Sequence, residues 1–119
     1  MYSDSVIKRV WDEKGIVVDG YDKELYRKDA VGAWIAFPMY GNRDSVLGWE
    51  IDHIWPKAMG GDDRIENLRP LNWRNNESKG DDYPVYKTAV VAENDKNVFR
   101  EEERTVNENI QKKLQEIYG

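Results

Sequence analysis

The sequence predicts an α+β domain built on a β-hairpin and a short helix, on three observations. Residues Trp49 to Trp55 alternate apolar and acidic side chains, the pattern of a strand with one buried face. The alternation resumes from Asn67 to Trp73, beyond a glycine-containing loop across which the two strands can pair. Residues Arg74 to Asp81 are polar, lack strand character and end near a glycine, which indicates a short helix laid across the hairpin.

Both ends of the chain are predicted to be amphipathic helices. Between Ser3 and Gly15, and again before the C-terminus, apolar side chains recur at helical spacing: Val6, Ile7, Val10 and Trp11, then Val106, Ile110, Leu114 and Ile117. A serine or aspartate between residues 3 and 5 can cap the first helix, and Gly15 ends it. Thr105 and Glu108 have capping-box spacing, which predicts where the second helix starts.

The remaining segments predict a small additional β element. Gly32 to Phe37 is rich in strand formers and ends at a proline. Val85 to Ala92 and Val98–Phe99 flank a turn-rich stretch and indicate a hairpin. Asp22 to Lys28 is interpreted as a helical turn that carries Tyr26 inward.

Length and composition favour one domain over residues 1–119. The chain has no linker rich in glycine, serine or proline. Hydrophobic residues make up 39% and charged residues 34%, but five tryptophans and seven tyrosines provide large buryable surfaces, so a small core is expected rather than disorder. The absence of cysteine excludes disulfides and thiolate zinc sites, which leaves metal binding to oxygen and imidazole groups.

The net charge of the chain argues against non-specific binding of nucleic acid over the whole protein surface. The net charge is −5, whereas non-specific affinity comes from lysine and arginine neutralising phosphates. The acids cluster partly at residues 101–103 and 81–82, and a bound metal can offset carboxylates locally. Residues 1–14 lack the apolar core of an export signal and no run is long enough to span a membrane, so a cytoplasmic location is predicted.

Asp52 and His53 are the residues most able to perform chemistry. His53 is the only histidine, and an imidazole is partly unprotonated near neutral pH. Adjacent strand residues point to opposite faces, so both reach one site only if the strand ends, twists or bulges there. Residues 75–77 offer further oxygen donors, and oxygen ligands favour Mg²⁺ or Mn²⁺. Such a site could hydrolyse a phosphodiester, with His53 deprotonating the attacking water.

Fixed elements of one motif follow in order between residues 48 and 82: Trp49-Glu50-Ile51-Asp52-His53-Ile54, Pro56, Gly60-Gly61, Asn67-Leu68, Pro70-Leu71, and Asn76 three residues before Lys79. This series resembles the HNH endonuclease family. The resemblance implies the ββα-metal fold, also called the His-Me finger, with the hairpin and short helix as its core.

The resemblance also implies roles for individual residues. His53 is expected to be the general base, Asp52 a metal ligand, and Asn67 the asparagine that orders the loop by bonding to its backbone. Asn76 stands where the family usually has its final histidine, and its amide oxygen is a weaker ligand than imidazole. Asn72 and Asn75 occupy positions where zinc-stapled relatives carry a cysteine pair.

Four basic residues are candidate contacts to nucleic acid. Lys79 is expected to bind phosphate because of its spacing from Asn76, and Arg74, Arg69 and Lys57 are candidate backbone contacts. Simpler interpretations remain open at this point. Asp52 can pair with an arginine, and Asn76 can cap the short helix.

The leading functional hypothesis is a metal-dependent HNH endonuclease that hydrolyses DNA with Mg²⁺ or Mn²⁺. One alternative is a toxin-like nuclease that cleaves RNA. Another is a non-catalytic acidic binding module that retains the ββα scaffold, since the chain is acidic and lacks the final histidine. An acidic nuclease has little affinity of its own for DNA, so a protein partner that targets it is a further hypothesis.

Overall fold

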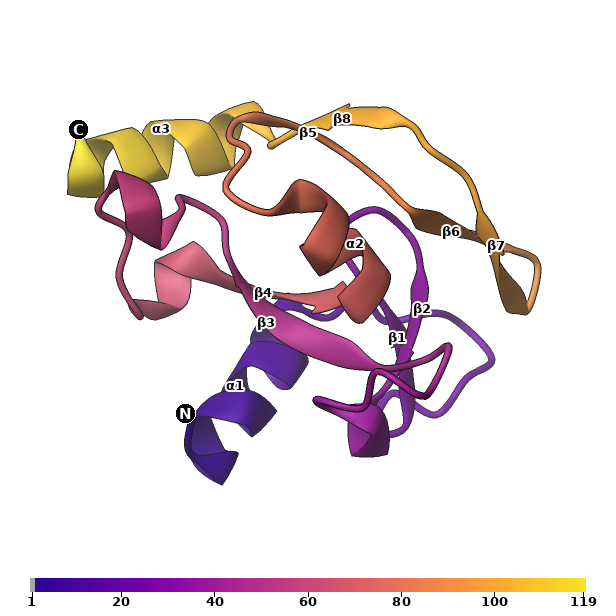
Figure 1. Ribbon diagram of the computed structural model, residues 1–119. Helices are drawn as coiled ribbons and strands as arrows, with labels where there is room; N and C mark the ends of the chain where they lie inside the picture. The colour runs from indigo at the N-terminus through magenta and orange to yellow at the C-terminus, as the bar shows by residue number, and fades with distance from the viewer. Residues whose placement is uncertain (1) are drawn as a thin grey trace.

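Three helices and four two-stranded antiparallel sheets make up the computed structural model, which describes residues 2–119 (Figure 1). The helices are α1 (Asp4–Lys14), α2 (Trp73–Lys79) and α3 (Glu108–Tyr118). The strands are β1 (Tyr26–Lys28), β2 (Trp34–Ala36), β3 (Trp49–His53), β4 (Leu68–Asn72), β5 (Val85–Lys87), β6 (Val90–Glu93), β7 (Lys96–Phe99) and β8 (Glu103–Thr105). The predicted α+β class is confirmed. None of the helices in this described part is long and apolar enough to cross a membrane.

The β3–β4 hairpin lies between α1 and α2 (Figure 1). The strands pair antiparallel in an unbroken register, with Trp49 opposite Asn72 and His53 opposite Leu68. Trp49 and Ile51 pack with the α1 core, whereas Asp52 contacts α2 through Lys79. The alternation expected from the sequence therefore separates an apolar face under α1 from a polar face under α2.

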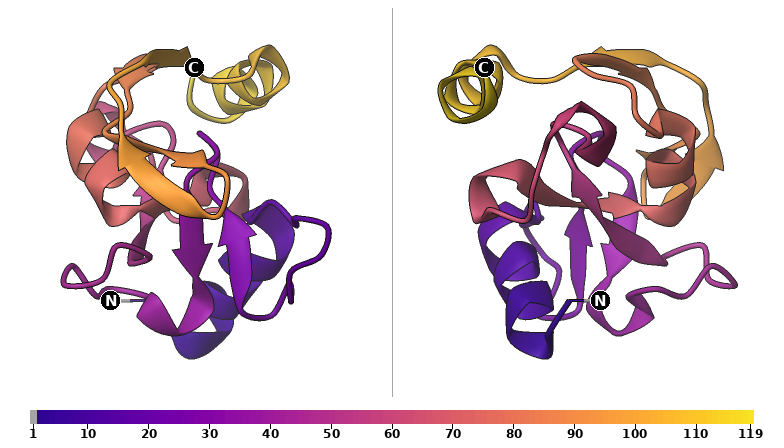
Figure 2. Two further views of the ribbon diagram at one scale, coloured as in Figure 1. Left: turned by 90° about the vertical axis from the view of Figure 1, so that its right-hand side faces the viewer. Right: turned by 60° about the vertical axis from the view of Figure 1, so that its left-hand side comes forward.

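Two hydrophobic clusters stabilise this arrangement. The first joins α1 to the hairpin, and its centre is a contact between Trp11 and Trp49, whose ring centroids are 5.3 Å apart. The second joins Ile54, Tyr86 and Leu114, which brings α3 to the opposite side of the hairpin from α1 (Figure 2).

The helix ends follow local capping chemistry, with one correction. Ser3 caps α1 by accepting a hydrogen bond from the amide of Val6, and Asn72 caps α2 by accepting from Arg74. The capping box predicted for the last helix is wrong, because Thr105 lies in β8 and α3 starts at Glu108, two residues later than a Thr105 cap would place it. Asn107 caps it, since its side-chain oxygen accepts from two amides of the first turn.

Two predictions for the smaller strands were wrong in part. The segment expected as one strand from Val85 to Ala92 is divided, because β5 pairs with β8 and β6 pairs with β7. The amides of Ala89 and Val90 at the division both donate to the side chain of Asn75. The helical turn expected over Asp22 to Lys28 ends at Tyr26, where β1 starts. The Tyr26 side chain was expected to point inward, but the residue is 39% exposed.

A buried hydrogen-bond network surrounds Asn72 and Asn75. The carboxylate of Asp29 accepts from the backbone of Val31, Ala33 and Asn72 and from the side chain of Asn75. Asn75 is 1% exposed and also bonds Ala89 and Val90. Burial raises the pKa of the Asp29 carboxyl, and the four N–H donors oppose that rise. These amide contacts join β4 and α2 to the segments before β2 and β6.

Substituting Asn75 by alanine is therefore expected to lower the free energy of unfolding by roughly 2–3 kcal/mol, because several buried backbone groups lose their partner. The matched control is Asn76→Ala, which removes one hydrogen bond to Glu50 and should cost under about 1 kcal/mol. Urea unfolding of both variants measures the difference. Equal losses would show that the buried network does not stabilise the fold in this way.

Candidate active site

A cavity of about 200 Å³ lies between the end of β3, the loop that follows it and α2. Ile51, Asp52 and His53 all line it, although neighbouring strand residues point to opposite faces. The strand ends at His53, and the chain then turns into the loop at Pro56 and Lys57, which also lines the cavity. Asp52 and His53 therefore border one space although the register between β3 and β4 shows no bulge.

His53 is held by a carboxylate and a tyrosine hydroxyl. Its Nε2 lies 2.7 Å from an oxygen of Asp63 and 3.1 Å from the hydroxyl of Tyr2, which itself donates to the same oxygen at 3.0 Å. An ionised carboxylate only accepts hydrogen bonds, so it favours a proton on Nε2 and leaves the lone pair on Nδ1.

Titration properties agree with this arrangement. The hydrogen bonds from His53 and then Tyr2 hold the pKa of the Asp63 carboxyl below its ordinary value. Burial, followed by the bond to Asp63, raises the pKa of the Tyr2 hydroxyl. At neutral pH Asp63 is thus anionic and Tyr2 is a neutral donor.

Sequence reasoning missed both Asp63 and Tyr2. Asp63 follows another aspartate in a glycine-containing loop, and Tyr2 precedes a helix that is predicted only from its amphipathic pattern. Neither position carries a signal of its own. Only the packing of α1 under the hairpin brings Tyr2 to His53.

Asn67 fixes the loop that carries Asp63. It is fully buried, accepts from the amide of Trp55 at 2.7 Å, and donates to the carbonyls of Trp55 and Asp62. Gly61 permits this, since a Cβ there would collide with the Trp55 carbonyl. The contacts are the backbone bonds that the family resemblance implies for this asparagine.

Asp52 is buried between two cations. Its side chain is 3% exposed, with one oxygen 2.9 Å from Nε of Arg69 and the other 3.3 Å from Nζ of Lys79. Lys79 also donates to the carbonyl of His53 at 3.1 Å, and burial lowers its pKa against the opposing effect of Asp52. The pairing of Asp52 with an arginine, left open by the sequence, is present.

This burial changes the interpretation of the basic residues. Arg69 and Lys79 are 6% and 1% exposed, so they hold Asp52 and are not on a surface that nucleic acid can reach. Lys57 is exposed beside the cavity. Arg74 lies on the outer side of α2, with its guanidinium 4.9 Å from the ring of the exposed Phe99. Lys57 and Arg74 remain candidate contacts to a nucleic acid backbone.

Asn76 lines the cavity from α2 and does not cap that helix. Its amide nitrogen donates to Glu50 at 3.0 Å, which leaves its amide oxygen for another partner. Burial would raise the pKa of Glu50, but hydrogen bonds from Arg43 and Asn76 lower it overall. Glu50 is therefore an ionised acceptor that orients the Asn76 amide.

The donor set fits a hard divalent cation held by few protein ligands. Asp52 and Asn76 provide two oxygens, and Mg²⁺ commonly binds through one or two carboxylates with water and phosphate oxygens completing its shell. Within residues 2–119 no three or more histidine and acidic side chains gather as a metal cluster. Because Arg69 and Lys79 oppose a cation at Asp52, the donors favour weak metal binding in the absence of substrate.

Comparison with known proteins identifies the segment that builds this cavity. Residues 44–85 match a family model described as HNH endonuclease, a range that contains β3, β4 and α2. No curated protein and no solved structure matches the chain. The family recognised from the sequence motif is confirmed over this range.

Proposed function

With residues 44–85 recognised as an HNH endonuclease segment, which indicates nuclease activity in general, we propose that this chain is a metal-dependent endonuclease that hydrolyses phosphodiester bonds in DNA. The observation that carries the proposal is the oriented His53 at a cavity that Asp52 and Asn76 also line. The succession of β3, β4 and α2 supports the ββα-metal assignment.

His53 acts as the general base in this proposal. Its Nδ1 accepts a proton from water as the water attacks phosphorus, and Asp63 stabilises the imidazolium that forms. Tyr2 contributes by fixing the carboxylate on which the imidazole depends. Asn67 acts as a positioning residue, because it orders the loop that supplies Asp63.

Asp52 and Asn76 are the residues that would hold Mg²⁺ or Mn²⁺, which when bound supplies positive charge to the phosphoryl group and the departing 3′ oxygen. Lys79 and Arg69 position Asp52 from within the fold. Lys57 and Arg74 are the proposed DNA contacts. Because the chain carries a net charge of −5, we also propose a protein partner that brings it to DNA.

A non-catalytic binding module is the second candidate function. The observation that favours it is the neutralisation of Asp52 by two cations, which weakens a metal site. The two candidates differ in one measurable property, which is cleavage that depends on a divalent metal.

The direct test incubates the chain with supercoiled plasmid and, in parallel, with single-stranded RNA in Mg²⁺, in Mn²⁺ and in EDTA. We expect nicked or linear plasmid with either metal and intact plasmid in EDTA. Cleavage of RNA alone would assign the activity to the RNA-cleaving alternative. Intact plasmid and RNA in both metals would leave the binding module as the function.

Removing the partner of the base should slow cleavage without abolishing it. Asp63→Asn is expected to lower kcat by roughly tenfold to a hundredfold, because an amide can present its N–H instead of an acceptor and disturb the imidazole tautomer. Asp62→Asn is the matched control, since this exposed neighbour bonds Arg64 and Tyr118 instead. Nicking rates at saturating plasmid measure both. A parental rate for Asp63→Asn would exclude Asp63 from orienting the base.

A further inference from the structure

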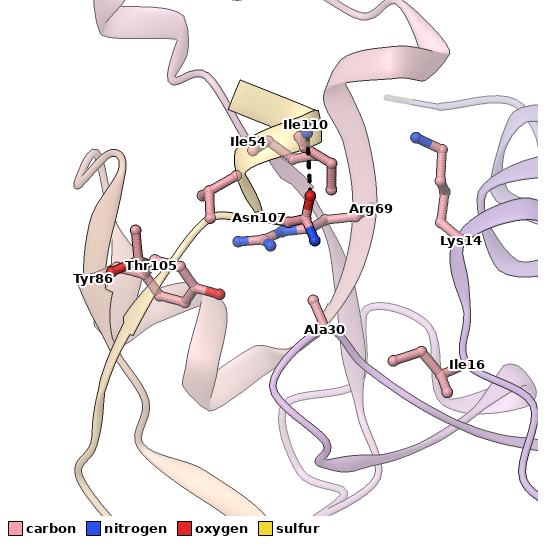
Figure 3. Close-up of a pocket in the computed structure, with 10 residues that line it drawn as sticks. Lys14, Ile16, Ala30, Ile54, Arg69, Tyr86, Thr105, Asn107 and Ile110 are labelled. Atoms are coloured by element: carbon pink, nitrogen blue, oxygen red, sulfur yellow. Dashed lines mark hydrogen bonds between the residues drawn. The ribbon is translucent and has the colours of Figure 1, made fainter. Parts of the chain in front are cut away.

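A second cavity, of about 410 Å³, lies at the β4 side of the hairpin (Figure 3). The end of α1, strand β4, strand β5 and the start of α3 border it. It shares no lining residue with the candidate active site. Its function is therefore a separate question from the cleavage reaction.

Arg69 brings a buried, unpaired donor to this cavity. The residue is 6% exposed, and its Nε pairs with Asp52 at 2.9 Å. Its Nη2 is buried and has no hydrogen-bond partner among the described residues. Figure 3 shows the guanidinium extending from β4 past Asn107 toward Tyr86. Buried N–H groups are rarely left without an acceptor, so this one indicates a missing partner.

The guanidinium is held in place for such a partner. Its central carbon lies 5.1 Å from the ring centroid of Tyr86, a buried residue of β5. The ion pair with Asp52 fixes the other end. A planar group restrained at two points loses little freedom when it binds a two-oxygen anion.

The rest of the lining has the charge and polarity that an anion requires. Lys14 provides a second cation, and no acidic side chain lines the cavity. The N-terminus of the 11-residue helix α3 opens beside it at Asn107, where the helix dipole is positive. Ile54, Val106 and Ile110 form apolar walls.

We propose that this cavity binds a small organic anion, with a carboxylate or phosphate group on Arg69 Nη2 and an apolar group against Ile54 and Val106, while Lys14 adds positive charge at the border of the cavity. The guanidinium selects the two-oxygen head group. The apolar side chains of the lining favour an organic anion, which has an apolar group to bury, compared with an inorganic ion. The proposal does not depend on nuclease activity.

The test titrates the isotope-labelled full chain with inorganic phosphate, phenyl phosphate and benzoate in buffer low in competing anions, with detection by NMR. We expect saturable shifts of the Arg69 Nε–H signal and of the Val106 and Asn107 amides. Phenyl phosphate is expected to bind about fivefold more tightly than inorganic phosphate, because only phenyl phosphate has an apolar ring to bury. The absence of saturable shifts at these signals with all three probes would overturn the proposal.

Two variants locate the binding without disturbing Asp52. Lys14→Ala is expected to weaken phenyl phosphate binding about twofold, because its charge attracts the anion from the border of the cavity, while Lys113→Ala, the same change at an exposed position of α3, leaves it unchanged. Ile110→Trp should block the cavity, and Ile110 is 36% exposed, so a larger side chain can be accommodated. If Lys14→Ala and Ile110→Trp both bind the probe as the parent does, the anion does not occupy this cavity.

Discussion

Replacing His53 by alanine is expected to lower the rate of metal-dependent plasmid cleavage by roughly 10²- to 10⁴-fold, the contribution typical of a positioned general base. His53 is the only imidazole in the chain, so no second histidine can replace it. Its side chain is 17% exposed and lies at the end of β3, so the fold should tolerate the change. Initial nicking rates in Mg²⁺ and Mn²⁺ measure the loss, with circular dichroism as a check on folding.

His53→Gln provides the matched control for shape and hydrogen bonding, because the glutamine amide reaches the position of the histidine Nε2. The glutamine amide can still donate to Asp63, but it cannot accept the proton of the attacking water. It should therefore be as inactive as His53→Ala while keeping parental stability. A His53→Ala variant that cuts at the parental rate would disprove the assignment of the base.

Replacing Asp52 by asparagine is expected to lower the free energy of unfolding by about 3–5 kcal/mol, because a buried charge that loses its partner is strongly destabilising. Arg69 and Lys79 would both remain buried, at 7% and 0% side-chain exposure, without the carboxylate between them. Mn²⁺ should stabilise the parent chain and fail to stabilise this variant, since Asp52 is also a proposed metal ligand. Urea unfolding with Mn²⁺ or EDTA measures both effects.

A double variant separates the two roles of Asp52. Adding Arg69→Met to Asp52→Asn removes one of the unpaired charges, so part of the lost stability should return. The response to Mn²⁺ should stay absent. Stabilisation by Mn²⁺ that persists in Asp52→Asn would place the metal on other residues, and a loss below about 1 kcal/mol would contradict the buried ion pairs.

The fold could be predicted where the signals are local. The two-residue period gave the β3–β4 hairpin, and Gly80 and Ser3 end or cap their helices through contacts within a few residues. The division of the strand predicted over Val85 to Ala92 could not be foreseen. Its cause is the side chain of Asn75, which is about fifteen residues away in the chain and takes the backbone donors.

The residues of the candidate site were likewise predictable from the sequence only in part. The family motif indicated Asp52, His53, Asn67 and Asn76, and the structure brings Asp52, His53 and Asn76 to one cavity while Asn67 ties the adjoining loop. Arg69 and Lys79 were interpreted as DNA contacts because the sequence shows their charge and not their burial.

The sequence by itself determined the order of strand, loop, strand and helix, the family of the segment at residues 44–85, and the identity of the only imidazole. Tertiary structure alone decided what surrounds each charged group. It places Tyr2 and Asp63 on His53, two cations on Asp52, and beside a cavity a guanidinium nitrogen with no partner among residues 2–119. The physical reason is that periodicity and capping act within a few residues, whereas burial and pairing depend on segments that meet only when the chain folds.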